Sequence, residues 1–326
     1  MFGLMQEHKL LVSSLIEHAV TCHPDAEIVS RTVEGPIHRS TYRDIHRRAK
    51  QVANALSALD VRRGDRVATL AWNGYRHMEL YFGVSGTGAV LHTVNPRLFP
   101  EQLEYIINHA EDTVLFFDLS FVSLVEKLLP RLNTVRTFVV MTDRAHMPEC
   151  AIPGLLCYED LLAAQSGVYA WPDFDENTAA SLCYTSGTTG MPKGVLYSHR
   201  STVLHALGAC TVDSLALSRN ETALLVVPMF HVNAWSMPYA GAMSGAKLVL
   251  PGPALDGANV YQLLRDEQVT LALGVPTVWM MLLQHASTTG LKPIDELALR
   301  RVVIGGAAVP RAMVEAFERE FGAFVV

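Results

Sequence analysis

The sequence predicts an α/β protein in which mostly parallel sheets are flanked by helices. Apolar, strand-like runs alternate with helical patterns along the chain, and 50% of the residues are hydrophobic. Regular alternation of strands and helices is typical of parallel sheets with helices on their faces. At 326 residues, the chain is long enough for two α/β subdomains, which we expect at approximately residues 1–175 and 176–326.

The first half opens with two predicted helices. Residues 10–22 carry apolar side chains at helical spacing, and Thr41 is placed to cap a helix over residues 41–59. We expect residues 142–175, which contain several prolines, to form an irregular connection. The other elements expected in this half are a strand at 66–71, a helix at 75–85, a strand at 89–94, a helix at 100–110, a strand at 113–117, a helix at 122–129 and a strand at 135–141.

The second half continues the same alternation. Apolar runs at 179–183 and 195–197 predict two strands around a polar loop. The elements expected after them are a helix at 201–212, a strand at 222–227, a helical stretch at 234–243, a strand at 247–250, a helix at 259–267, a strand at 269–273, a helix at 277–285, a strand at 301–304, a helix at 310–321 and a final strand from 323.

The polar loop between these two strands has the composition of a phosphate-binding site. From residue 185 to 194 it reads Thr-Ser-Gly-Thr-Thr-Gly-Met-Pro-Lys-Gly. Glycines let backbone N–H groups approach an anion, hydroxyls add neutral donors, and the lysine adds a positive charge. The residues expected to hold a polyphosphate are Thr185, Ser186, Gly187, Thr188, Thr189, Gly190, Lys193 and Gly194.

Two other interpretations of this loop are a flexible surface loop and a Walker A loop. The four hydroxyls and three glycines between two apolar runs disfavour a plain surface loop. The Walker A order G-x-x-x-x-G-K-[ST] is not met, because Pro192 precedes Lys193 and a glycine follows it.

Two further segments carry candidate site residues. Residues 226–235 read Val-Val-Pro-Met-Phe-His-Val-Asn-Ala-Trp, so a strand delivers His231 and Trp235 to its carboxyl end, where ligands collect in open α/β sheets. A lone histidine is more often a core residue, but the neighbouring aromatic side chains favour a site. Residues 304–310 combine a strand end, a Gly-Gly turn and a proline-started helix, which is a weak signal by itself.

The composition indicates which binding partners and which cellular compartment to expect. A net charge of −6 disfavours nucleic-acid binding. The five cysteines form no C-x-x-C pair, which favours reduced thiols in the cytoplasm. The longest apolar stretch, residues 271–283, contains Pro276 and is too short to cross a bilayer, so we expect no transmembrane segment.

The loop resembles, nearly residue for residue, the phosphate loop [ST]-S-G-T-T-G-x-P-K-G of the adenylate-forming superfamily, which includes acyl-CoA synthetases, luciferases and adenylation domains. Residues 228–234 are similar to that superfamily's P-x-F-H-x-x-[GA], and the Asn-Ala-Trp form resembles its medium- and long-chain fatty-acid–CoA ligases. The resemblance covers essentially the whole chain. It implies an incomplete N-terminal, ATP- and acyl-binding domain without the small C-terminal domain, and little turnover by this stretch alone.

The resemblance also implies roles for single residues. Thr185 resembles a magnesium-contacting hydroxyl, His231 orients the acid carboxylate, and Trp235 gates an apolar tunnel for the acyl chain. Residues 278–283 either line that tunnel or form a simple core helix. The backbone matching the border of the adenine and acyl pockets is Gly305, Gly306 and Ala307.

ATP, Mg²⁺ and coenzyme A are the implied reactants and cofactor, and a fatty acid is the implied substrate. A short substituted propionate or an aryl acid is an alternative substrate. Alternative classes are a non-catalytic nucleotide- or acyl-binding module and a Walker-type NTPase. The resemblance further suggests a homodimer formed through the N-terminal region.

Overall fold

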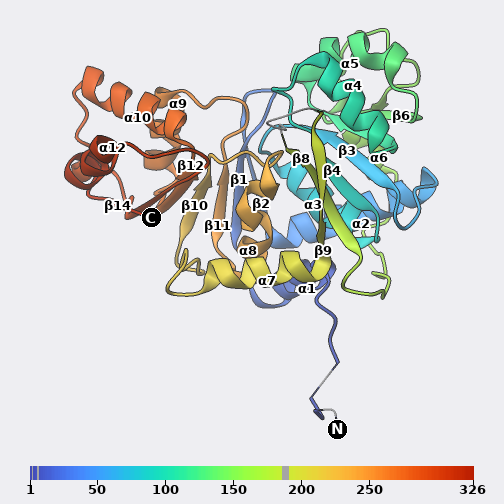
Figure 1. Ribbon diagram of the computed structural model, residues 1–326, viewed down its shortest axis with the longest axis horizontal. Helices are drawn as coiled ribbons and strands as arrows, with labels where there is room; N and C mark the ends of the chain where they lie inside the picture. Colours follow the sequence, from blue (N-terminus) through green and yellow to red (C-terminus); the bar gives the residue numbers. More distant parts are fainter. Residues whose placement is uncertain (2, 6, 186–190) are drawn as a thin grey trace.

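The computed structural model describes residues 1, 3–5, 7–185 and 191–326 (Figure 1). Within these residues the strands form two seven-stranded sheets, called sheet A and sheet B below. Neighbouring strands run parallel, except for one antiparallel pair at an edge of each sheet. The predicted class, mostly parallel sheets flanked by helices, is therefore confirmed.

Sheet A has the strand order β14-β13-β12-β10-β11-β1-β2. Its strands are β1 (Glu27–Arg31), β2 (Ile37–Thr41), β10 (Thr222–Leu225), β11 (Lys247–Leu250), β12 (Leu271–Gly274), β13 (Arg301–Ile304) and β14 (Phe324–Val325). The β1–β2 hairpin is absent from the sequence-based prediction. Its position depends on parallel pairing of Ile28 with Leu248 of β11, a strand from the other half of the chain.

Sheet B has the strand order β7-β6-β5-β3-β4-β8-β9. Its strands are β3 (Arg66–Leu70), β4 (Val90–Thr93), β5 (Asp112–Phe117), β6 (Thr137–Val140), β7 (Leu156–Cys157), β8 (Ala179–Thr185) and β9 (Lys193–Ser198). Strands β8 and β9 come from the second half of the chain, whereas β1 and β2 of sheet A come from the first. The sheets therefore do not follow a division of the chain near residue 175.

Most helices lie close to their predicted positions, whereas the short helices at residues 158–163 and 293–296 have no predicted counterpart. The helices are α1 (Val12–Cys22), α2 (Tyr42–Ala58), α3 (Tyr75–Gly86), α4 (Pro100–His109), α5 (Val122–Leu128), α6 (Tyr158–Ala163), α7 (His199–Cys210), α8 (Met237–Ser244), α9 (Gly257–Asp266), α10 (Pro276–Thr289), α11 (Pro293–Glu296) and α12 (Arg311–Ala316), which runs into a π-helical turn (Phe317–Phe321). Thr41 caps α2 as predicted, because its hydroxyl accepts the Asp44 N–H at 3.3 Å.

Two details of the predicted helices and loops are wrong. The connection at residues 142–175 is not wholly irregular, since it contains β7 and α6. The helix expected from residue 234 begins only at Met237, because the residues before it form a left-handed turn. None of the helices described is both long and apolar enough to cross a membrane.

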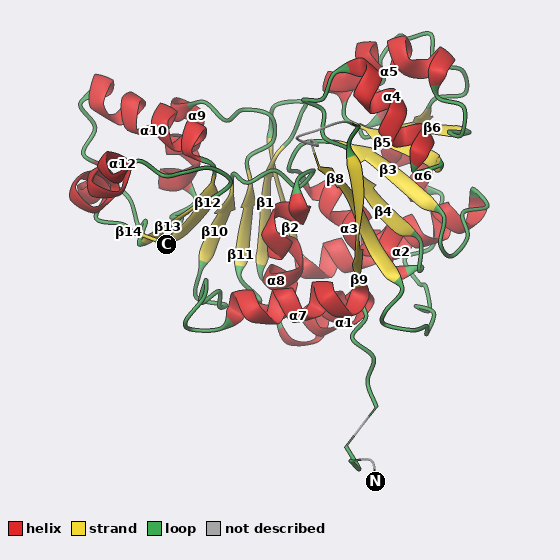
Figure 2. Ribbon diagram, in the orientation of Figure 1, coloured by secondary structure: helices red, strands yellow, loops and turns green. Residues whose placement is uncertain are grey.

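Helix α3 lies between the two sheets and is buried along its whole length. Figure 2 shows α3 and α8 in this central position, with sheet A on one side and sheet B on the other. The Tyr81 ring of α3 packs against the Tyr239 ring of α8 at a centroid distance of 5.4 Å. Both rings belong to a core that includes side chains from both sheets. This shared core fixes the sheets beside each other.

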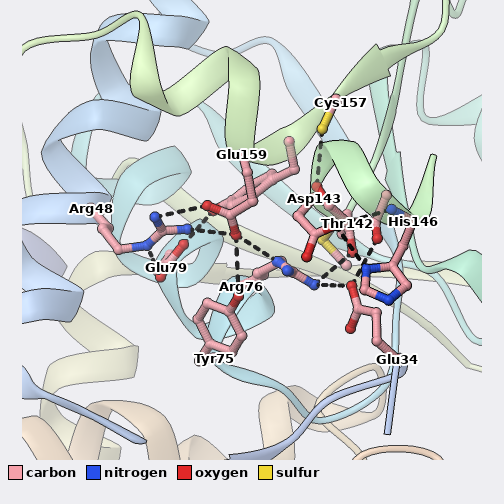
Figure 3. A network of polar contacts seen from close by, with 12 residues as sticks. Glu34, Arg48, Tyr75, Arg76, Glu79, Thr142, Asp143, His146, Cys157 and Glu159 are labelled. Atoms are coloured by element: carbon pink, nitrogen blue, oxygen red, sulfur yellow. Dashed lines mark hydrogen bonds and ion pairs between the residues drawn. The ribbon is translucent and has the colours of Figure 1, made fainter. Parts of the chain in front are cut away.

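A buried polar network joins α2, α3, α6 and the β1–β2 turn (Figure 3). Arg48 donates to the fully buried Glu79 at 2.5 Å and contacts Glu159 at 3.0 Å. Arg76 bridges Glu159 and Glu34, each at 2.8 Å. Burial raises the pKa of the Glu79 carboxyl, and the Arg48 guanidinium acts against that rise. The charge on Glu79 is therefore tolerated largely because Arg48 lies beside it.

Replacing Arg48 by Met is expected to lower the free energy of unfolding by about 3–5 kcal/mol, because Glu79 is left buried without its cation. The double variant Arg48→Met/Glu79→Gln should recover most of this loss, since neither charge remains and the introduced carboxamide can still accept the hydrogen bond that Tyr158 donates at 2.6 Å. Urea titrations of the three proteins measure the differences. A double variant no more stable than Arg48→Met would contradict this account.

His199, the first residue of α7, is buried as a neutral imidazole. Its Nδ1 accepts the N–H of Val12 at 3.1 Å, and its ring packs edge-on against Phe174 at 4.9 Å. Burial lowers the pKa of His199 to about 4. An unfolded chain protonates this histidine below about pH 6.5. Stability that is present above pH 6.5 is therefore lost as the pH falls toward 4.

The variant His199→Asn is expected to lose less stability than the unchanged protein between pH 6.5 and 4, by up to about 3 kcal/mol. Asparagine keeps an acceptor near the Nδ1 position but does not titrate. Urea midpoints at a series of pH values measure the difference, to which other titrating groups such as His77 and Asp118 contribute equally in both proteins. Parallel pH profiles would refute the assignment.

Candidate functional site

The predicted strand–loop–strand around the glycine-rich stretch is confirmed at both ends. Strands β8 and β9 are antiparallel, and Thr185 is paired in register with Lys193. Both side chains are exposed. Among the described residues, no carboxylate lies within ion-pair distance of the Lys193 ammonium, so its charge faces solvent. An anion at this edge of sheet B would meet an exposed cation and an exposed hydroxyl.

Five predicted phosphate contacts lie outside the described residues. They are Ser186, Gly187, Thr188, Thr189 and Gly190. Gly194, just past the loop, is described and has a steric reason to be glycine. A Cβ there would lie 3.1 Å from Leu182 and 3.2 Å from the Tyr184 ring.

The segment after β10 is held by a residue that sequence reasoning missed. The buried Asn73 follows β3 and donates to the carbonyls of Leu225 and Val227 at 2.7 and 2.8 Å. Its own oxygen accepts the N–H of Met229 at 2.7 Å. Three hydrogen bonds from one side chain thus join the carboxyl ends of sheet A and sheet B. The sequence feature that could have identified Asn73 is its place just after a predicted strand.

The predicted aromatic and histidine residues follow directly. Phe230 is buried, with Trp72 edge-on to its ring at 6.2 Å and the Arg97 guanidinium 5.7 Å from its centre. His231 is exposed to solvent as a whole residue. Neighbouring atoms still remove part of the water around its imidazole, which lowers the pKa of the ring. Near neutral pH this ring is therefore mainly uncharged, with one N–H to donate and one nitrogen to accept.

Trp235 and Gly305, predicted from separate motifs, are brought together. A Cβ on Gly305 would lie 3.0 Å from two carbons of the Trp235 ring, so the indole packs directly on the glycine backbone. The Gly305 N–H donates to the carbonyl of Gly274 at 3.2 Å. Gly306 and Ala307 continue the turn as exposed residues. The carboxyl ends of β10, β12 and β13 therefore form one wall with the indole against it.

The turn that carries Trp235 also contacts the strand that carries Thr185. Asn233 is buried and donates to the Ser181 hydroxyl of β8 at 2.6 Å. Cys183 is buried and donates to Asn233 at 3.4 Å. The aromatic segment therefore contacts β8, the strand that leads into the glycine-rich stretch, although the two motifs are far apart in the sequence.

The remaining predicted segment has mostly a core role. In α10, Val278, Trp279 and Leu282 are buried, whereas Met280 and Met281 are exposed. The Trp279 ring packs against Phe317 at 5.8 Å. Among the described residues, no group of three or more His, Cys, Asp or Glu side chains is arranged to hold a metal ion.

Comparison with known proteins adds to this geometry. The family described as "AMP-binding enzyme" matches residues 16–326. The chain is 49% identical over 326 residues to a medium-chain-fatty-acid–CoA ligase of Ectopseudomonas oleovorans, covering 100% of this chain and 59% of that protein. It is 51% identical over 322 residues to a 3-methylmercaptopropionyl-CoA ligase of Ruegeria lacuscaerulensis, covering 99% of this chain and 59% of that protein.

Solved structures share the fold. A long-chain-fatty-acid-CoA ligase of Archaeoglobus fulgidus superposes with a TM-score of 0.85 at 20% identity, covering 98% of this chain and 62% of that one. An anthranilate CoA ligase in complex with anthranoyl-AMP gives a TM-score of 0.83 at 24% identity, covering 97% of this chain and 59% of that one. The chain thus spans about three-fifths of the length of the relatives it matches.

The variant Gly305→Ala is expected to displace the Trp235 indole and lower the free energy of unfolding by about 1–3 kcal/mol, because the new methyl group overlaps the ring. Urea titration and tryptophan emission measure the two effects. The matched control is Gly208→Ala in α7, where a Cβ meets no atom within 4 Å and alanine favours the helix. Equal stability of the Gly305→Ala variant and the unchanged protein would show that the indole does not rest on this glycine.

Proposed function

Because this chain belongs to the AMP-binding enzyme family, we propose that it forms the ATP- and acid-binding part of an AMP-forming acid–CoA ligase. One observation carries the proposal: Asn233 ties the segment with His231 and Trp235 to β8, the strand that ends at Thr185. The strand that leads into the proposed phosphate-binding loop and the aromatic turn proposed to face the acid are thereby in contact. Joining a carboxylate to a nucleotide requires both at one place.

The proposed reaction has two steps. In the first, the acid carboxylate attacks the α-phosphate of ATP, and pyrophosphate leaves. In the second, the thiol of coenzyme A attacks the acyl carbon, AMP leaves and the thiol proton is released. Both reactants of the first step are anions, so the site has to offset their repulsion and fix their geometry.

We assign residues to the phosphates, the carboxylate and the acyl chain according to their chemistry. Lys193 and the loop at residues 186–190 hold the β- and γ-phosphates, since a cation and hydroxyl or amide donors suit those oxygens. His231 is exposed beside the aromatic turn and orients the carboxylate by donating a hydrogen bond. Trp235 borders the acyl chain together with the backbone of Gly305, Gly306 and Ala307. We also assign the adenine side of the site to the backbone of Gly305, Gly306 and Ala307.

Magnesium fits this site only with ligands from the nucleotide. Thr185 is exposed at the end of β8 and can offer one hydroxyl oxygen. The remaining ligands would be phosphate oxygens and water, as is usual for Mg²⁺ bound with nucleotides. The ion would offset charge on the phosphates, and Thr185 is the one residue that we assign to it.

A medium- or long-chain fatty acid is the proposed substrate. The apolar face of the Trp235 indole suits an alkyl chain, and the relative from E. oleovorans is named for a medium-chain acid. A short substituted acid is the second candidate, because the relative from R. lacuscaerulensis, at 51% identity, is a 3-methylmercaptopropionyl-CoA ligase. We place the reaction in the cytoplasm, since all five cysteines are free thiols. Pairing of two copies through the N-terminal region stays a prediction of the resemblance.

The protein expressed over its full reading frame is expected to release pyrophosphate from ATP only when a carboxylic acid is present. A series of acids from 3-methylmercaptopropionate to long-chain fatty acids, assayed by pyrophosphate release, ranks the substrates. Phosphate release without an acid would instead support an NTPase. Absence of release with every acid would favour a binding module.

Lys193→Met is expected to raise the KM for ATP by about tenfold, because a charge-assisted phosphate contact is lost. The control is Lys127→Met, which removes an exposed lysine on α5 that has no assigned role in the site. Kinetics with ATP as the varied substrate and saturating acid measure the effect. An unchanged KM in Lys193→Met would remove this lysine from the phosphate site.

A further inference from the structure

The turn at residues 232–236 holds five consecutive non-glycine residues in the left-handed region of the backbone map. The φ angle is 47° at Val232, 49° at Asn233 and Ala234, 54° at Trp235 and 60° at Ser236. Each L-residue in this conformation costs roughly 1–2 kcal/mol. A run of this kind persists only where surrounding contacts hold it. The turn therefore depends on its anchors.

Asn233 is the anchor in the middle of the turn. Its side chain is buried, its Nδ2 donates to Ser181 at 2.6 Å, and its Oδ1 accepts from Cys183 at 3.4 Å. Burial raises the pKa of the Cys183 thiol, which keeps the S–H proton that Asn233 accepts. The Thr93 hydroxyl lies 3.2 Å from the same sulfur and completes the buried chain of polar groups. In such a site a lost partner leaves an unsatisfied group.

A second anchor lies at the end of the turn. The Ser236 hydroxyl is 2.8 Å from Nδ1 of His205 in α7. This contact fixes where the turn leads into α8 but does not reach β8. The contacts of Asn233 are therefore the ones that set the turn against sheet B.

The same contacts connect the turn to the nucleotide end of β8. Side chains alternate along a strand, so Ser181, Cys183 and Thr185 point to one face of β8. Asn233 forms hydrogen bonds with the first two of these residues. Two residues after Asn233, the Trp235 indole rests on Gly305 of the opposite sheet. One carboxamide thus lies between the strand that carries Thr185 and the wall that supports the indole.

We propose that Asn233 is a positioning residue whose carboxamide seats the Trp235 indole relative to Thr185 and so sets how the acid is bound. An asparagine suits this place for two reasons. Its short side chain donates and accepts at once, which matches a hydroxyl and a thiol two residues apart on a strand. Asparagine also tolerates a left-handed backbone better than most residues. The consequence for acid binding rests on the proposed function, whereas the seating of the indole does not.

Fluorine NMR tests the seating of the indole without any assay of activity. The chain has four tryptophans, so labelling with 5-fluorotryptophan gives four signals, and Trp235→Phe identifies one of them. Asn233→Ala is expected to shift or broaden the Trp235 signal and leave the other three in place. Ser181→Ala removes one of the two partners and should move the same signal less. If Asn233→Ala does not fold, Ser181→Ala decides the question by itself.

The matched control is Ser85→Ala. The Ser85 hydroxyl is buried and donates to the carbonyl of Ala180 at 2.8 Å, so it contacts β8 at a residue that does not bind Asn233. Its removal should leave the Trp235 signal where it is. An unchanged Trp235 signal in Asn233→Ala, or an equal change in Ser85→Ala, would overturn the proposal.

Kinetics test the consequence for the acid. In the protein expressed over its full reading frame, Asn233→Ala is expected to raise the KM for the acid about tenfold, and the KM for ATP far less. An equal change in kcat and in both KM values would indicate general loss of structure and contradict the positioning role. If the unchanged protein releases no pyrophosphate with any acid, the proposed function fails, while the fluorine signals still decide whether Asn233 seats the indole.

Discussion

The whole arrangement depends on burying helix α3 between two mostly parallel sheets. A helix that has no solvent-facing side is stable only when it is covered all round, and here side chains of both sheets and of helices α1, α2 and α8 cover it. Because the strands next to α3 run in fixed directions, their carboxyl ends are brought to a common edge. A ligand that needs groups from both sheets can be bound only at that edge.

Hydrophobic packing places the sheets side by side, but hydrogen bonds from polar side chains set how the two sheets are aligned. Asn73 binds three backbone groups of the segment after β10, and Asn233 binds two side chains of β8. Each satisfies several donors and acceptors at a buried position, where unsatisfied groups are costly. A nonspecific apolar contact could slide along the sheet edge, whereas these hydrogen bonds fit one alignment.

The chemistry proposed for this edge follows from the same geometry. Two anionic reactants can meet only if a cation and directed donors reduce their repulsion, and if an apolar surface takes the rest of the acid. Lys193 and Thr185 lie at the exposed end of the β8–β9 hairpin of sheet B, and the Trp235 indole packs on Gly305, which follows β13 of sheet A. The polar and apolar parts of the proposed site therefore come from different sheets and meet at the boundary between them.

The sequence by itself determined the α/β class, most helices and strands, the Thr41 cap and the strand–loop–strand form of the glycine-rich stretch, because these depend on residues close together in the chain. It also singled out Trp235 and Gly305, but as members of separate motifs. Only the tertiary structure decided that these two residues touch, that β1 joins β11 in sheet A, and that residues 232–236 turn left-handed before α8 begins. Each of these features depends on partners distant in sequence, and a left-handed run of ordinary residues has no local pattern that predicts it, since long-range contacts supply the energy that holds it.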